Sequence, residues 1–473
     1  MRKIRFYDIF HSHRRPKVLV IGLDAASPEL VFDRFSNDLP CLTQLRQRGM
    51  WGKLKSTIPP ITIPAWTSMT TGCEPGQLGI YGFRSRRAYN YSPLSLVDST
   101  DVPVKRVWDY LGKAGLKSIL VGIPQTYPIK RVNGIMISGL LTPSTDSPYT
   151  FPPELRYEID STVGQYVIDV DQFRTENKNG LLQNIFDMTK KRFHLIKYLI
   201  AKKPWDFFMF VEIGPDRMHH GFWKYCDPHH RFYQSGNSYE NSIRNYYQYL
   251  DFEIGELLSL VDNQTIIIVV SDHGALRMEG GIGINEWLIQ QGYLVLRQNP
   301  GKSAPLDQCN IDWSRTLAWA EGGYYARVFL NVKGREPQGM IDPENYEKVR
   351  SELAEKISAI PDDHGKPLPT RVFKPQDVYR EIRGIPPDLI VYFGGLHWRS
   401  IGRVGTGKIH FFENDTGPDN ANHSEYGIFL LYDPRKPGNG RELQGREILD
   451  IAPTILQSFG IKPPRHMIGK SLI

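Results

Sequence analysis

Short, continuously apolar segments alternate along the chain with longer segments whose apolar positions recur at helical spacing. A strand buried on both faces of a parallel sheet reads as such an apolar run, whereas an amphipathic helix repeats its apolar positions every three or four residues. The pattern predicts a helix that ends at a break at Gly115 and is followed by a strand. It also predicts a last helix that starts near Asp450 and is ended by Gly460. It also predicts buried strands at 17–24, 204–216, 264–274 and 425–434, and helices at 242–262 and 343–360.

This strand–helix alternation indicates an α/β fold in which helices cover both faces of a mostly parallel sheet. The pattern changes at residues 275–416, where short strands and glycines surround one clear helix. We therefore expect four parts: a basic lead-in at 1–16, a core at 17–274, an inserted α+β cap at 275–416, and the second part of the core at 417–473.

Composition narrows the class of protein. The 473 residues are 40% apolar, which is enough for a large core. A net charge of +7 suits an anionic substrate or an anionic surface. Because the basic residues are spread out and no nucleic-acid-reading motif occurs, we expect a small substrate rather than a nucleic acid.

The cysteines and the apolar segments indicate the cellular compartment of the protein. The four cysteines form no CxxC pair, so the sequence indicates neither a disulfide framework nor a cysteine zinc site. No apolar run reaches the roughly 18 residues of a membrane span, and the basic N-terminal segment has no apolar signal-peptide core. We expect a cytoplasmic protein, with contact between the basic N-terminus and acidic lipid as the weaker alternative.

Three of the apolar segments end in an aspartate: Asp24, Asp216 and Asp272. In an open α/β sheet, ligands bind at the carboxyl ends of the strands. One such aspartate alone is most simply a helix cap or a turn residue. After the first strand, however, Ser27 followed by Pro28 makes the better helix start, which leaves Asp24 without a capping task.

Two of these aspartates have a histidine at a spacing that suits metal binding. His220 follows Asp216 by four positions, so on a helical turn both side chains share one face; the neighbouring His219 has the less favourable spacing. Asp272 directly precedes His273 at a strand end, where a turn can bring both side chains to one site. Carboxylate with neutral imidazole suits Zn²⁺ and related divalent ions.

Thr62 lies in a rigid, proline-rich approach to a predicted helix, "IPPITIPAWTSMTTG", which Gly72 ends. A hydroxyl at a helix start faces free N–H groups and the positive end of the helix dipole, which is a good location for an anionic phosphate. The alternative is that Thr62 is only the N-cap of this helix.

Together these elements resemble the alkaline phosphatase superfamily, in particular its type I phosphodiesterase/nucleotide pyrophosphatase branch and the group described as AlkP-superfamily phosphohydrolases or phosphomutases. The likeness runs through "VIGLDAASPEL", "IPPITIPAWTSMTTGCEPGQLGIYGF", "VEIGPDRMHH", "VVSDHG" and "ILDIAPTILQSFGIKPP", in this order. It implies an alkaline-phosphatase-like three-layer αβα core with a mostly parallel sheet and an inserted α+β cap.

The resemblance also implies two divalent metal ions, with zinc expected and manganese as the alternative. For the last ligand we expect His423, because the family's histidine stands a few residues before a glycine and an apolar strand; His397 and His410 are the alternatives. By similarity, one ion would be bound by Asp24, Thr62, Asp272 and His273, and the other by Asp216, His220 and His423.

A site of this kind suits phosphoryl transfer. Metal coordination can activate the weakly nucleophilic hydroxyl of Thr62, and a second ion can stabilise the leaving oxygen. We expect hydrolysis of a small phosphodiester or phosphomonoester through a covalent phospho-Thr62 intermediate. The alternatives are a phosphomutase or phosphotransferase with the same site, and a non-catalytic binding protein on a phosphatase scaffold.

One position departs from the nucleotide pyrophosphatases that the chain resembles. After the segment "GIYG" they carry an asparagine that contacts the phosphoryl oxygen, where this chain has a phenylalanine. Guanidinium forks suit phosphate oxygens, so neighbouring basic side chains are candidates for that role, with a solvated basic loop as the simpler alternative. The candidate substrate-binding residues are Phe83, Arg84, Arg86 and Lys130, with Arg87 and Arg131 beside them.

Overall fold

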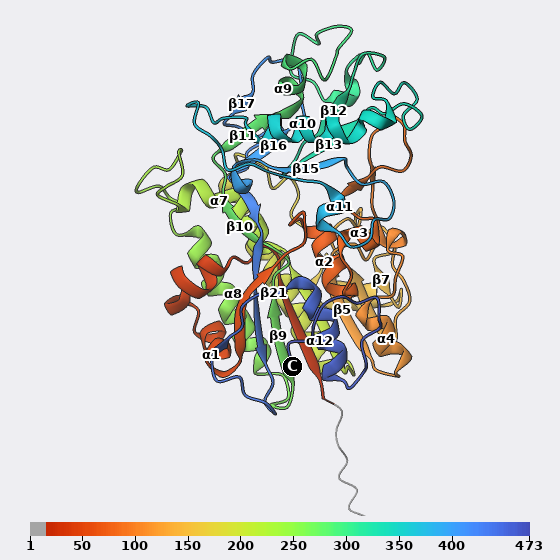
Figure 1. The fold of residues 1–473 in the computed structure, drawn as a ribbon. Coiled ribbons are helices and arrows are strands. Elements are labelled where there is room, and N and C mark those ends of the chain that lie inside the picture. Colours follow the sequence, from red (N-terminus) through yellow and green to blue (C-terminus); the bar gives the residue numbers. More distant parts are fainter. Residues whose placement is uncertain (1–15) are drawn as a thin grey trace, which may run out of the picture.

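The computed structural model describes residues 16–473, and its centre is a ten-stranded sheet (Figure 1). The strand order is β20-β2-β19-β9-β1-β8-β5-β6-β7, with β21 beside β2. The five central strands, β9, β1, β8, β5 and β6, run parallel, whereas β19 and β7 pair with their neighbours antiparallel. The strands are β1 (Val18–Leu23), β2 (Met50–Lys55), β5 (Ser118–Ile123), β6 (Gly134–Ser138), β7 (Thr150–Phe151), β8 (Phe207–Glu212), β9 (Ile266–Val270), β19 (Tyr426–Tyr432), β20 (Arg441–Glu442) and β21 (Arg446–Glu447).

Strand β1 shows why the central segments are apolar without interruption. Its side chains alternate between two hydrophobic clusters, with Leu19, Ile21 and Leu23 on one face of the sheet and Val18 and Val20 on the other. All five are fully buried. A strand covered on both faces has no solvent side on which polar residues are favoured.

Helices cover both faces of this sheet, which confirms the predicted three-layer αβα core. The larger cluster packs under α1 (Pro40–Arg48), α5 (Leu155–Val163), α6 (Lys178–Lys202), α7 (Gly214–Cys226) and α8 (Ser242–Leu258). The opposite face packs under α2 (Thr62–Thr71), α4 (Val107–Lys113) and α12 (Ile451–Ser458).

The cap lies beyond the carboxyl ends of the parallel strands (Figure 1). It leaves and rejoins the core through an antiparallel pair, β10 (Gly274–Arg277) with β18 (Ala421–Ser424). A four-stranded sheet contains β12 (Ala318–Glu321), β13 (Ala326–Leu330), β15 (Leu389–Tyr392) and β14 (Arg371–Phe373), and a three-stranded sheet contains β16 (Trp398–Ile401), β11 (Gly280–Gly283) and β17 (His410–Phe411). Its helices include α9 (Ile284–Gln290), α10 (Tyr346–Ser358) and α11 (Pro375–Val378).

Part of the first core segment also contributes to the cap. After α3 (Pro75–Leu78) the chain forms the short pair β3 (Arg84–Ser85) and β4 (Ser95–Leu96). Between them, Leu94 is buried in the main hydrophobic cluster of the cap, and Tyr91 packs against that cluster.

Several element boundaries differ from the sequence-based prediction. The strand predicted at 204–216 ends at Glu212, so Asp216 lies in the first turn of α7 instead of at a strand end. The helix after β1 is a π-helix whose N-cap is Pro28 and whose first residue is Glu29, one position later than predicted. The helix predicted at 242–262 stops at Leu258.

The predicted basic lead-in lies, apart from its last residue, outside the described residues. The four cysteines are all free, in agreement with the sequence. Within residues 16–473, no helix combines the length and the apolar character that a membrane crossing needs.

Candidate metal and catalytic centre

The seven residues predicted to bind metal or to attack the substrate come together at the carboxyl edge of the sheet. Each of them is at most 4% exposed. Asp24 directly follows β1, and Asp272 and His273 follow β9. Thr62 is the first residue of α2. Asp216 and His220 lie on α7, and His423 lies on β18.

One group surrounds the N-terminus of α2. Nε2 of His273 lies 3.4 Å from Oγ1 of Thr62, 3.2 Å from Oδ2 of Asp272 and 3.8 Å from Oδ1 of Asp24. Ligand atoms of the two aspartates and His273 all lie within 4.8 Å of one another, as binding to one ion requires. Because α2 begins at Thr62, its hydroxyl stands at the positive end of the helix dipole.

The second group surrounds Asp216. Its Oδ1 lies 3.3 Å from Nε2 of His220 and 3.7 Å from Nε2 of His423, and these two nitrogens are 3.3 Å apart. The four-residue spacing on α7 therefore places Asp216 and His220 on one face, as predicted.

The two groups adjoin through a pair of stacked imidazoles. The rings of His273 and His423 are 3.8 Å apart at an interplanar angle of 17°. Asp216 also offers an oxygen within 4.8 Å of ring nitrogens of both histidines. Two ions held by these groups would therefore be close neighbours.

Each of the three histidines is oriented through its Nδ1 atom. Nδ1 lies 2.7 Å from Oδ1 of Asp419 in His220, 3.0 Å from the Pro60 carbonyl oxygen in His423, and 2.9 Å from the Gly274 carbonyl oxygen in His273. An acceptor at Nδ1 leaves Nε2 with a free lone pair, which is the usual arrangement of a metal-binding histidine. All three Nε2 atoms lie within the two groups described above.

The carboxylates follow a matching pattern, with one oxygen held by a donor and the other unpaired. Trp66 Nε1 donates to Oδ2 of Asp24 at 2.8 Å, and the Ala25 amide donates to Oδ1 of Asp272 at 3.2 Å. Arg217 donates to Oδ2 of Asp216 at 2.6 Å. The other oxygen of each aspartate is buried without a hydrogen-bond partner. Three unpaired buried carboxylate oxygens that face imidazole nitrogens fit divalent metal ions.

The pKa values differ between the two groups. Against the effect of burial, Asp419 raises the pKa of His220, and His220 lowers that of Asp216. Burial raises the pKa of Asp24 and Asp272 well above the ordinary value, and each is raised further by a neighbouring carboxylate, Asp216 for Asp24 and Asp24 for Asp272. Burial lowers the pKa of His273 to about 4 and that of His423 well below its ordinary value, so both imidazoles are neutral near pH 7. A divalent cation would stabilise the ionised carboxylates beside neutral imidazoles.

The three histidines considered as alternative ligands lie outside the two groups. The ring of His219 turns away from the site and stacks on Tyr247, with Nε2 3.2 Å from the phenol oxygen. His397 and His410 lie in the cap, where their ring nitrogens pair with the backbone carbonyl oxygens of Arg277 and Pro361.

Tyr324 and Asp419 belong to the site although no sequence pattern marks them. The Tyr324 ring reaches down from the cap and stacks on His423 and His220, at centroid distances of 4.1 and 5.1 Å. Arg174 donates to the Tyr324 hydroxyl at 2.7 Å and to Asp419 at 2.9 Å. The only local signal for Asp419 was its place four residues before His423.

The four candidate substrate-binding residues are not gathered at this centre. Phe83 packs against the hydrophobic clusters that contain Ile61 and Ile63, the two neighbours of Thr62. Arg86 is buried in the cap and pairs with Glu336 at 2.9 Å.

The other basic candidates use their charged groups elsewhere. Arg84 donates to the carbonyl oxygen of Leu94, and Lys130 donates to that of Ser99. Arg87, which directly follows Arg86, pairs with Asp101.

A family model described as type I phosphodiesterase/nucleotide pyrophosphatase matches residues 18–419. The chain belongs to this family. The type I phosphodiesterase/nucleotide pyrophosphatase family belongs to the alkaline phosphatase superfamily and hydrolyses phosphoric esters, so the resemblance seen in the sequence is confirmed and the protein is a hydrolase of this class. Members typically depend on two metal ions, in keeping with the ligand groups described above.

Solved structures share this fold at low sequence identity. Murine ectonucleotide pyrophosphatase/phosphodiesterase 5, in an inactive form in complex with AMP, is 13% identical over 95% of this chain and 96% of that chain, with a TM-score of 0.54. Phosphonoacetate hydrolase from Sinorhizobium meliloti 1021, in complex with phosphonoformate, is 14% identical over 94% of this chain and 96% of that chain, with a TM-score of 0.59. Among curated proteins no match is found.

Proposed function

We propose that the protein hydrolyses a small phosphodiester or phosphomonoester with Thr62 as nucleophile and two divalent metal ions, most simply zinc, as cofactors. The observation that carries the proposal is the set of unpaired carboxylate oxygens of Asp24, Asp216 and Asp272, which face imidazole nitrogens beside the Thr62 hydroxyl. Asp24, Asp272, His273 and Thr62 would hold one ion, and Asp216, His220 and His423 the other.

Thr62 would carry the covalent step. Its Oγ1 loses its proton and bonds to the phosphorus as the bond to the leaving oxygen breaks, and that oxygen leaves as an alcohol after it takes up a proton. Water then cleaves phospho-Thr62, which restores the hydroxyl and releases phosphate from a monoester or a phosphomonoester from a diester. The ions, when bound, supply positive charge that favours the ionised hydroxyl and neutralises the leaving oxygen. The start of α2 adds its dipole and directs its first N–H groups toward the phosphoryl oxygens.

The experiment is a comparison of Thr62→Ala and Thr62→Ser with the wild-type enzyme on p-nitrophenyl phosphate and bis(p-nitrophenyl) phosphate. Thr62→Ala should lower kcat by about a thousandfold or more, because no nucleophile remains. Thr62→Ser should retain measurable turnover. Metal content, measured by elemental analysis, should stay near the wild-type value in both variants, since the carboxylate and imidazole ligands remain.

Two results would contradict this proposal. Wild-type turnover in Thr62→Ala would exclude Thr62 as nucleophile. Transfer of the phosphoryl group to an added alcohol or to another position of the substrate, with no hydrolysis product, would instead indicate a transferase or mutase reaction at the same site.

A further inference from the structure

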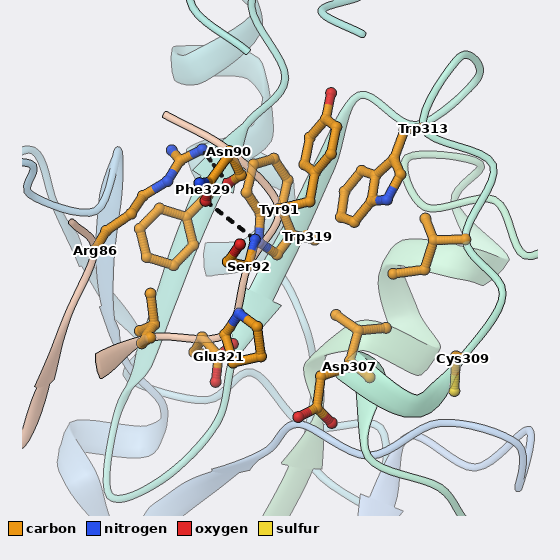
Figure 2. A pocket seen from close by; sticks show the side chains of 14 residues that line it. Arg86, Asn90, Tyr91, Ser92, Asp307, Cys309, Trp313, Trp319, Glu321 and Phe329 are labelled. Atoms are coloured by element: carbon orange, nitrogen blue, oxygen red, sulfur yellow. Dashed lines mark hydrogen bonds between the residues drawn. The ribbon is translucent and has the colours of Figure 1, made fainter. Parts of the chain in front are cut away.

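A cavity lies in the cap, apart from the candidate metal centre (Figure 2). Its volume is about 130 Å³, and it is bounded on one side by the segment from Arg86 to Leu94 and on the other by β12, β13 and the 3-10 helix Leu306–Gln308. It continues into a cavity of about 400 Å³, since Pro93, Leu94, Leu306, Asp307 and Glu321 line both.

Aromatic side chains form one end of this cap pocket (Figure 2). Tyr91 and Trp313 stack at 3.8 Å with their rings nearly parallel, and Trp319 meets both rings edge-on. Trp319 and Phe329 are cross-strand partners in β12 and β13 and also stack. These rings are held rigidly by one another, so they provide preformed faces for a ligand.

The same rings already accommodate one cation. The Arg86 guanidinium lies 5.2 Å from the ring centroid of Trp319 and 5.4 Å from that of Phe329, within the range of a cation–π interaction. It donates at 2.9 Å to Glu336, which also pairs with Arg335. Glu336 thus offsets part of the positive charge that Arg86 brings to this end of the pocket, and the other charged groups of the lining lie elsewhere.

Those remaining groups are two carboxylates at the opposite end of the pocket, Asp307 and Glu321 (Figure 2). Within residues 16–473, neither side chain makes a hydrogen bond or an ion pair. Asp307 is exposed, whereas Glu321 is half-buried, with Arg327 opposite it in the register of β12 and β13. Glu321 is on β12 two positions after Trp319, so both side chains are on the same face of the strand.

The surroundings of Glu321 favour a positively charged neighbour. Burial raises its pKa, and the negative charge of Asp307 adds to this effect, while Arg327 and Arg84 lower it only in part. Both guanidiniums also donate to backbone carbonyl oxygens, Arg327 to that of Arg84 and Arg84 to that of Leu94. A cation in the pocket would be a further positive neighbour for Glu321, with Asp307 at the exposed rim.

We propose that the cap pocket binds an organic ammonium ion, with its alkyl groups against the Trp319 face and its charge toward Glu321 and Asp307. Aromatic faces attract ammonium ions through the ring quadrupole, and the half-buried Glu321 adds a charge interaction in a partly desolvated place, to which the exposed Asp307 contributes from the rim. A neutral apolar ligand would use the rings but leave both carboxylates unpaired.

The cap pocket is linked to the metal centre by one short segment. Gly322 and Gly323 line its 400 Å³ continuation, and the next residue is Tyr324, whose ring covers His423 and His220. Arg399 also lines the continuation and pairs with Asp419, the partner of His220. The proposed binding of an ammonium ion in the cap pocket is independent of the proposed hydrolysis.

The test is a measurement of equilibrium binding to the full-length protein, with tryptophan fluorescence as the signal. The probes are tetramethylammonium chloride and the neutral neopentyl alcohol, at constant ionic strength set with sodium chloride. Tetramethylammonium should give a saturable change, since Trp313 and Trp319 line the site. Glu321→Gln and Asp307→Asn should each weaken its binding by about tenfold, because either change removes one charge.

A matched control is Glu352→Gln, which removes an exposed carboxylate from α10 elsewhere in the cap and should leave binding unchanged. Asp307 is exposed, so Asp307→Asn should fold even if the change at Glu321 disturbs β12. Equal binding of the neutral alcohol would overturn the proposal, as would wild-type affinity in both carboxylate variants. Neither result would bear on hydrolysis at Thr62.

Discussion

The imidazole of His220 is held between two carboxylates, with Nδ1 2.7 Å from Asp419 and Nε2 3.3 Å from Asp216. Asp216 lies one helical turn away on α7, whereas Asp419 comes from the end of the inserted cap, 199 residues later in the chain. Two guanidinium groups, those of Arg174 and Arg399, also pair with Asp419. These partners lower its pKa, against the effect of burial, so it stays ionised and fixes the His220 ring.

Asp419→Asn should therefore weaken the second metal site. Loss of a carboxylate partner behind a metal-binding histidine typically costs 10-fold to 100-fold in metal affinity, and we expect a decrease of about that size. Zinc titration of the apo-protein with a competing chromophoric chelator measures it.

The control for Asp419→Asn is Asp388→Asn. Asp388 is a buried cap carboxylate that pairs with Arg335 and Tyr346, so its loss also removes a carboxylate partner from a half-buried guanidinium, which Glu336 continues to pair. Both variants should melt at a lower temperature, but only Asp419→Asn should bind zinc more weakly. Equal zinc affinity in the two variants would show that Asp419 only stabilises the fold.

Asp24→Asn should separate metal binding from folding. The pKa of Asp24 is raised in the fold, so without metal its ionised form opposes folding at pH 7; the amide removes this charge. The metal-free variant should therefore be at least as stable as the metal-free wild type. With zinc the order should reverse, because the variant gains less from the ion.

Thermal unfolding with and without chelator measures both effects of Asp24→Asn. Asp251→Asn is the comparison, since Asp251 accepts hydrogen bonds from the amides of Cys41 and Leu42 at the start of α1, away from the metal centre. It should lower stability equally in both conditions. A metal-free Asp24→Asn protein that unfolds well below the wild type would contradict the prediction.

Tyr324→Ala should speed up metal release. The ring covers both His220 and His423, and its removal opens a path for water and chelator to the second group. We expect zinc transfer to a chelator to be about tenfold faster, which corresponds to the loss of a contact with a free energy of about 1.4 kcal/mol. Tyr157→Ala, at a tyrosine that is 70% exposed on the core, should leave the rate unchanged.

Acid sensitivity should depend in part on His230. Burial lowers its pKa to about 4, and its Nδ1 accepts a hydrogen bond from the Phe232 amide. Because this pKa lies below the unfolded value of about 6.5, the unfolded chain binds the proton first, and stability falls as the pH drops from 6.5 to 4. The loss from this residue is at most about 3 kcal/mol.

His230→Gln should make unfolding by urea less dependent on pH between 6.5 and 4, although it costs some stability at pH 7. His229→Gln, at the exposed neighbouring position, is the matched control and should keep the wild-type pH dependence. An unchanged slope in His230→Gln would assign the acid sensitivity to other groups.

Local patterns predicted the features of the site that depend on short spacing. The apolar run into Asp24 and the four-residue interval from Asp216 to His220 each describe one element, and the structure places them as expected at one edge of the sheet. The strand prediction failed at Asp216 because the apolar pattern of β8 continues into the buried first turn of α7.

Long-range partners could not be predicted in this way. Arg86 reads as one of several basic residues in a loop, yet it pairs with Glu336, 250 positions away. Tyr324 has only glycines and another tyrosine around it, and its position over His423 follows from how the cap folds back on the core. Such contacts depend on tertiary packing, to which the periodicity of a single element gives no guide.

The strand pair β10–β18 has a consequence for how this family can diversify. His273 directly precedes β10, His423 lies on β18, and the register places Ala275 opposite His423. The whole cap between them thus starts and finishes beside two of the proposed metal ligands. Insertions, deletions or exchange of the intervening domain can alter which molecules reach the centre, provided that Asp419, which fixes the His220 ring, is kept. A chimaera that joins this core to another cap at β10 and just before Asp419 is a practical route to new substrate specificity.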